Sequence, residues 1–116
     1  MKKVQLYPTS LAEFGEYLNK CIHNKFIIDS MVFTDLLHFH LQQIKHKLHV
    51  KSLDFQYKAR KSVTVRLDYA EQITLSYMFK HVEIDSTMAT MLGVEYQVLD
   101  GLTIGDMSRV YGVGII

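Results

Sequence analysis

The sequence predicts an α+β fold: two N-terminal helices packed on an antiparallel β-meander, with a C-terminal β-hairpin. Apolar residues recur every three or four positions up to about residue 49, and they alternate with polar residues from 53 to 79. Asp100-Gly101 then has the composition of a tight hairpin turn. The chain has 116 residues, 48% of them hydrophobic, which fits a single α+β domain over residues 1–116.

The first segment predicts a short strand and a helix. Val4 and Leu6 alternate with polar neighbours, which indicates a strand over residues 3–7 that Pro8 ends. Ser10 and Glu13 have the spacing of a capping box, so a helix is expected from 11 to about 22. Its apolar positions have helical spacing, and they are Leu11, Phe14, Tyr17, Leu18, Cys21 and Ile22.

A second helix is predicted from Asp29 or Ser30 to about His49. Its apolar stripe follows the helical period and consists of Phe33, Leu36, Leu37, His40, Leu41, Ile44 and Leu48. The opposite face is polar and carries His38, Gln42, Lys45, His46 and His49. Such a helix is expected to pack its stripe on a core and to leave the polar face in solvent.

The middle of the chain predicts three consecutive strands. Apolar and polar residues alternate over 53–57, over 63–69 and over 73–79, and short polar links join the three segments. Strands that are apolar on one face only are typical of an antiparallel meander. The two helices would then cover the apolar face of this sheet.

The C-terminal part predicts a short helix over 86–92, ended by Gly93, and then a hairpin. The arms of this hairpin are 94–98 and 102–104, on either side of Asp100-Gly101. The last seven residues, 110–116, are apolar or glycine and carry no charged side chain.

The cysteine content and the length of the apolar runs restrict the expected location of the protein. Cys21 is the only cysteine, which excludes an intramolecular disulfide and a Cys-rich zinc site. A single thiol among apolar residues indicates a buried structural cysteine. No targeting segment is evident, and no apolar run has the roughly 20 residues that a membrane span needs. The expected location is the cytoplasm, or a virus particle or large complex, with no membrane contact.

The sequence contains no recognisable catalytic or phosphate-loop motif. His46 and His49 are three residues apart on the second helix, but a zinc site needs three or four converging ligands. A metal or hydrolytic site around these histidines is a minority hypothesis, and the preferred interpretation is a solvated polar face. The chain is therefore predicted to be no enzyme, with no catalytic residue, metal, cofactor or small-molecule substrate.

The charged residues are distributed unevenly along the chain, although the formal net charge is only +1. Between positions 45 and 66 the only acidic residue is Asp54, and the basic residues are Lys45, Lys47, Lys51, Lys58, Arg60, Lys61 and Arg66. Residues 81–116 are acidic apart from Arg109. The basic stretch predicts a site for nucleic-acid phosphates or for an acidic partner. A basic and an acidic patch on one small domain also suit contact between copies.

The preferred hypothesis for function is a non-enzymatic interaction or assembly protein, a small subunit that self-associates or docks on a larger complex of the virion-connector or multi-subunit type. Its contact would be the acidic C-terminal segment and the apolar tail, whose interface residues are Val110, Tyr111, Val113, Ile115 and Ile116. One alternative is a nucleic-acid-binding module that uses the basic stretch. Another is a small inhibitor, of the phage anti-defence type, that binds a host protein.

Overall fold

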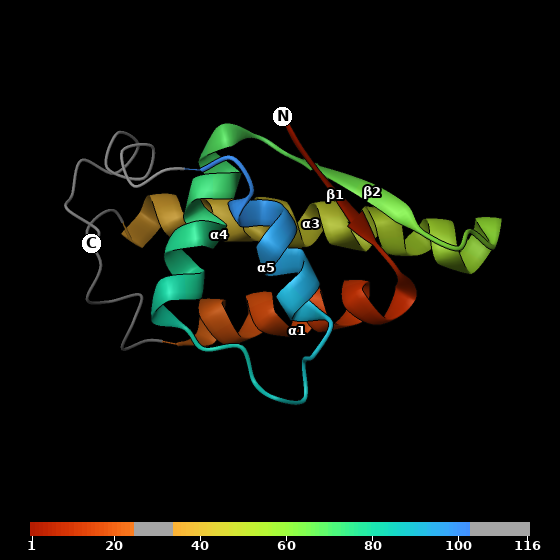
Figure 1. The fold of residues 1–116 in the computed structure, drawn as a ribbon. Helices are drawn as coiled ribbons and strands as arrows, with labels where there is room; N and C mark the ends of the chain where they lie inside the picture. Colours follow the sequence, from red (N-terminus) through yellow and green to blue (C-terminus); the bar gives the residue numbers. More distant parts are fainter. Residues whose placement is uncertain (25–33, 103–116) are drawn as a thin grey trace.

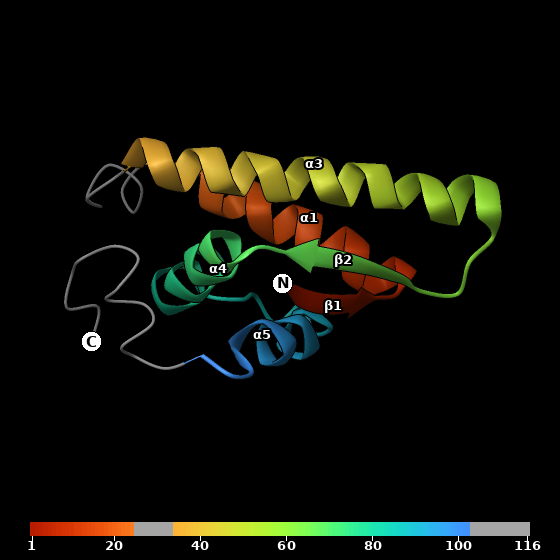
Figure 2. The same cartoon turned by 90° about the horizontal axis from the view of Figure 1, so that it is seen from above.

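The computed structural model describes residues 1–24 and 34–102, which form helices and a two-stranded sheet (Figure 1). The elements follow one another as β1 (Lys2–Leu6), α1 (Pro8–His23), α3 (Thr34–Lys58), β2 (Val63–Leu67), α4 (Tyr69–His81) and α5 (Met91–Leu99). Helix α3 forms one outer layer, α5 lies on the opposite side, and α1, the sheet and α4 lie between them (Figure 2). The predicted fold was therefore wrong: the described residues contain four helices and a two-stranded sheet, with neither a meander nor a C-terminal hairpin.

The sheet joins two distant segments of the chain. β1 pairs antiparallel with β2, and Val4 lies opposite Val65 at the centre of the register. Both strands alternate buried and exposed residues, so each turns one face to the core. The strand expected at 3–7 is confirmed, and Pro8, which ends it, is the first residue of α1. A proline fits the first helical position because the backbone N–H that it lacks would have no partner there.

The start of α1 differs from the predicted capping box. Ser10 lies inside the first turn, where its Oγ accepts from the Tyr7 N–H at 2.7 Å. Glu13 instead binds a residue far away in the sequence: its Oε1 accepts a hydrogen bond from the Thr90 N–H at 3.0 Å. The helix thus begins three residues earlier than its apolar spacing indicated.

The predicted strand over 53–57 is wrong, because these residues form the last turns of α3. Leu53 and Tyr57 are exposed, and Phe55 is partly buried against the core. Lys58 Nζ lies 3.5 Å from Asp54 Oδ1, an i,i+4 ion pair that suits a helix. After Lys58 the helix ends at Ala59, whose φ of 49° is the left-handed conformation common just past a helix.

The predicted strand over 73–79 is wrong as well, because these residues form most of α4. Asp68 caps this helix: its side chain accepts from the Glu71 N–H at 2.7 Å, and Glu71 Oε1 accepts from the Asp68 N–H at 2.9 Å. Thr74 and Ser76 are buried and donate to the carbonyls four residues earlier. Because these hydroxyls are satisfied within the helix, their polar positions can be buried at little cost. Helix α4 is buried on nearly every side and therefore has no apolar stripe.

The short helix predicted over 86–92 is absent, and the first arm of the predicted hairpin is helix α5. Met91, Val94 and Val98 are buried at positions i, i+3 and i+7, which is helical spacing. Asp100-Gly101 forms a turn, but one that ends this helix: the Leu102 N–H donates to the Leu99 carbonyl, and Gly101 has a φ of +83°. The second arm, from residue 103 on, lies outside the described residues.

The core lies between α1, α3, α4, α5 and the inner face of the sheet. Tyr17 is fully buried, stacks on Phe79 at 5.3 Å, and donates its hydroxyl to the Val82 carbonyl at 2.6 Å. Cys21 is also buried, as the sequence indicated. Burial raises the pKa of the Cys21 thiol to about 12, so it is protonated and unreactive at neutral pH.

Candidate nucleic-acid interface

A basic hollow lies between the C-terminal half of α3 and the outer face of the sheet. It is an open concavity of about 600 Å³ lined by Lys3, Lys51, Asp54, Arg60, Ser62, Val63, Thr64 and Arg66. Its cations come from β1, α3, the link after α3 and β2. We use "basic hollow" for this site.

The strand pattern places two of the cations. β2 alternates buried valines and leucine with exposed residues, so Arg66 points outward while Val65 and Leu67 enter the core. Lys3 is exposed on β1 and is the register partner of Arg66. Two like charges directly opposite one another in an antiparallel pair are destabilising. The outer face of the sheet therefore holds a repulsion that a bound anion would relieve.

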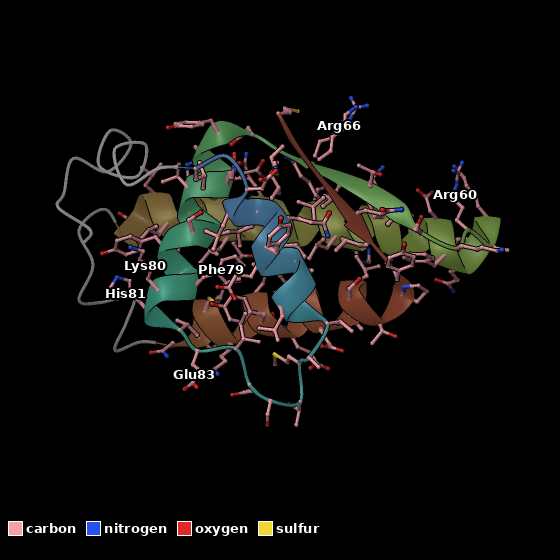
Figure 3. All side chains as sticks on the ribbon, in the orientation of Figure 1. Arg60, Arg66, Phe79, Lys80, His81 and Glu83 are labelled. Atoms are coloured by element: carbon pink, nitrogen blue, oxygen red, sulfur yellow. The ribbon has the colours of Figure 1, made fainter. Side chains whose placement is uncertain are left out.

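The other two cations are placed by the end of α3. Lys51 is half-buried on the side of the helix that faces β2. Ala59, in its left-handed conformation, turns the chain back towards the sheet, and Arg60 follows it. The side chains of Arg60 and Arg66 extend from the same edge of the molecule (Figure 3).

The basic hollow has an excess of positive charge. Its one carboxylate, Asp54, already lies 3.5 Å from Lys58. Within the described ranges, no ion pair joins Lys3, Lys51, Arg60 or Arg66 to a carboxylate. Guanidinium groups bind phosphate through two parallel hydrogen bonds, and lysines bind it as point charges. The hollow is thus suited to a phosphate-bearing ligand.

The structure separates the basic residues that the sequence grouped together. Lys51, Arg60 and Arg66 line the hollow, whereas Lys61 is exposed on the adjoining link and is not part of the lining. Lys45 lies on the other flank of α3, beside an apolar groove against α1.

Two more of the predicted basic residues have partners within the chain. Lys58 pairs with Asp54. The Lys47 ammonium binds groups within the fold: its Nζ lies 2.5 Å from the wholly buried carboxylate of Glu71 and 2.9 Å from the Arg66 carbonyl. Lys47 is therefore not free to hold a ligand, whereas Lys58 is held only by a weak surface pair, with 63% of its side chain exposed.

Lys3 is the site residue that sequence reasoning missed. It lies 63 positions before Arg66, so no local charge count joins the two. The available signal was the predicted strand at 3–7, since an exposed residue of that strand faces whichever strand pairs with it. The pairing itself is decided only in the tertiary structure.

The predicted acidic partner surface is partly used within the chain. Asp85 Oδ1 lies 2.9 Å from Lys20 Nζ, and Asp100 Oδ2 lies 3.1 Å from Lys2 Nζ. These exposed pairs tie the C-terminal part of the chain to α1 and β1. The tail residues proposed as an interface, Val110, Tyr111, Val113, Ile115 and Ile116, lie outside the described residues.

The chain matches no protein-family model, no curated protein and no solved structure. Function is therefore inferred from the site alone. Over residues 1–24 and 34–102, no three His, Cys, Asp or Glu side chains gather as a metal site would require. In the same ranges, no helix combines the length and the apolar character that crossing a bilayer demands.

Proposed function

We propose that this chain is a non-enzymatic binding protein that holds the phosphate backbone of a nucleic acid in the basic hollow. The observation that carries the proposal is the set of four cations without a described carboxylate partner, contributed by separate elements to one concavity. Nucleic-acid affinity is dominated by such contacts, because each neutralised phosphate releases counterions.

One feature favours a nucleic acid over an acidic protein as the ligand. The like-charged pair of Lys3 and Arg66 is more fully neutralised by a backbone with one charge on every phosphate than by scattered carboxylates. The guanidinium forks of Arg60 and Arg66 match phosphate and carboxylate oxygens alike, so they add affinity for either ligand.

The hollow contains no aromatic side chain on which a base would stack. Tyr57, which is exposed, and Phe55 both belong to α3 and do not line it. The expected binding is therefore electrostatic, steeply dependent on salt, and nearly indifferent to base sequence.

The test is fluorescence anisotropy with labelled single- and double-stranded DNA and RNA of mixed sequence, between about 50 and 200 mM salt. Arg60→Gln combined with Arg66→Gln is expected to weaken binding about tenfold or more and to reduce the salt slope by roughly 1 for each contact removed. Lys45→Gln and Lys80→Gln are the matched controls, because they remove cations outside the hollow. They should leave affinity almost unchanged.

Three outcomes would overturn the proposal. One is no binding at the lowest salt, and another is equal losses in the double variant and the controls. The third is equally tight binding of polyglutamate, which would show that the hollow selects carboxylates and not phosphates.

Assembly through the C-terminal tail stays a prediction, because the tail lies outside the described residues. The inhibitor hypothesis also stays a prediction. Both remain compatible with a charged, non-enzymatic surface.

A further inference from the structure

Helix α3 has apolar side chains on two opposite sides. One side carries the buried residues Leu37, Leu41, Ile44 and Leu48. The other side faces away from every other element, since α3 is the outermost layer (Figure 2). Large apolar side chains are nonetheless exposed there, and they are Leu36 (39%), Phe39 (56%), Val50 (48%), Leu53 (40%) and Tyr57 (75%).

The outward residues follow a heptad pattern. Positions spaced alternately by three and four residues along α3 are Leu36, Phe39, Gln43, His46, Val50, Leu53 and Tyr57. This is the a/d spacing of a coiled-coil seam, which lets a helix pack along a second helix for several turns. We call these residues the outer seam. All seven are exposed, and no described part of the chain covers them.

The outer seam can pack on the outer seam of a second copy whose α3 runs in the opposite direction. A two-fold axis between residues 44 and 45 would place Leu36 opposite Leu53 of a second copy, and Phe39 opposite Val50. Gln43 would then face His46, so two polar layers lie at the centre with apolar layers on both sides. Polar layers of this kind lower affinity but specify register and orientation.

The helix dipoles favour the antiparallel arrangement, because antiparallel dipoles attract one another. A parallel arrangement would put Asp35 beside Asp35 and Lys58 beside Lys58. In the antiparallel register Asp35 is level with Asp54 of the second helix and about one turn from Lys58, and these two residues already form an ion pair with each other. The end charges therefore add little attraction, and the apolar layers carry the contact.

The available area is sufficient for a weak dimer. At about 200 Å² for a full aromatic side chain, Phe39 exposes about 110 Å². Tyr57 extends past the start of the second helix, and the other five outer-seam residues raise the figure to roughly 450 Å² per copy. This gives about 900 Å² for two copies, which suits a weak interface and not a permanent one. We propose that the outer seam binds the outer seam of a second copy, forming an antiparallel two-helix dimer.

The first test is sedimentation equilibrium of the full chain over about 5 to 500 µM, which brackets the weak affinity that this area allows. A monomer–dimer equilibrium is expected. Phe39→Glu should weaken it at least roughly tenfold, because it places a charge between apolar layers. Tyr96→Glu is the matched control, since Tyr96 is an exposed aromatic residue (76%) on α5. It should leave dimerisation unchanged.

A second variant keeps the proposal falsifiable if Phe39→Glu perturbs folding. Gln43→Leu combined with His46→Leu makes the two central layers apolar and should tighten the dimer at least roughly tenfold. A monomer at every concentration for both the natural chain and this variant would overturn the proposal. So would a dimer that Phe39→Glu and Tyr96→Glu affect equally.

Orientation is tested with a short bismaleimide crosslinker and the single variants Phe39→Cys and Val50→Cys. The antiparallel register predicts a crosslinked dimer when the two variants are mixed and little in either alone. Crosslinking of Phe39→Cys with itself would indicate parallel helices and overturn this register. Cys21 does not interfere, because it is buried. None of these measurements involves a nucleic acid, so their outcome is independent of the proposed function.

Discussion

Lys47 Nζ lies 2.5 Å from Oε1 of Glu71, a carboxylate whose side chain is wholly buried. The same ammonium donates to the Arg66 carbonyl at 2.9 Å, so one lysine ties α3 to the end of β2 and the start of α4. Oε2 of Glu71 has no hydrogen-bond partner among the described residues. A buried carboxylate with one unpaired oxygen depends strongly on its single cation.

Replacing Lys47 with methionine is therefore expected to destabilise the fold by about 3 kcal/mol, because it leaves a buried carboxylate without the cation that neutralises it. Urea unfolding followed by circular dichroism measures the change. The control is Lys45→Met, which removes an exposed cation from the same helix and should cost less than about 0.5 kcal/mol. Equal losses in the two variants would contradict a special role for the Lys47–Glu71 pair.

Adding Glu71→Gln to the Lys47→Met variant should restore part of the lost stability. The neutral amide removes the uncompensated charge, although it keeps a polar group in the interior. The same urea measurement, on both single variants and the double variant, gives the coupling between the two positions. A double variant whose loss equals the sum of the two single losses would show that the pair does not act as a unit.

The opposition of Lys3 and Arg66 predicts that Lys3→Thr stabilises the free protein by about 0.5 kcal/mol at low salt. The gain should shrink as salt screens the repulsion. Lys2→Thr is the neighbouring control with the opposite sign, because Lys2 lies 3.1 Å from Asp100 and gains from that pair. Thermal unfolding at two salt concentrations distinguishes the variants. A loss of stability in Lys3→Thr at low salt would show that the repulsion is negligible.

The cap of α4 predicts that Asp68→Ala lowers the free energy of unfolding by about 1 kcal/mol, because the Glu71 N–H loses its acceptor. Asp68→Asn should keep most of the stability, since asparagine also accepts that hydrogen bond. Asp85→Ala, which removes an exposed ion pair with Lys20, is expected to have a smaller effect. If Asn and Ala at position 68 were equally destabilising, the cap would not be the source of the loss.

Burial raises the pKa of the Cys21 thiol to about 12 and raises the pKa of the Tyr17 hydroxyl as well. In the unfolded chain a thiol titrates near 8.5, so the unfolded state loses this proton first as pH rises. The stability is fully present below about pH 8.5 and falls towards pH 12, by up to about 1.4 kcal/mol per pH unit for Cys21.

Urea unfolding at about pH 8, 9 and 10 tests this alkaline destabilisation. Cys21→Ala should be less stable at pH 8, because it leaves a cavity in the core. Its stability should nevertheless fall less steeply with pH than that of the natural chain, since one titrating group is gone. Parallel pH profiles for the two proteins would contradict the assignment.

Local sequence patterns were sufficient to predict a helix or strand where one face of the element meets solvent. The strand at 3–7, the first helix and the strand that begins at Val63 each show a contrast between an apolar face and a polar face. The same alternation over Ile73–Phe79 was misleading, because α4 is buried and its Thr74 and Ser76 are satisfied by its own carbonyls. The overlooked signal was the Asp68–Glu71 capping box, which marks a helix start independently of apolar period.

The sequence by itself determined that basic residues are concentrated between positions 45 and 66 and that Cys21 is buried. Only the tertiary structure decided which of these cations share a surface. It brought Lys3 opposite Arg66, directed Lys47 to a buried carboxylate and put Lys45 on another flank of α3. The physical reason is that the burial of an element with one apolar face follows from local periodicity. Long-range hydrogen-bond partners and the neighbours of a charge depend instead on strand pairing and helix packing between segments far apart in the chain.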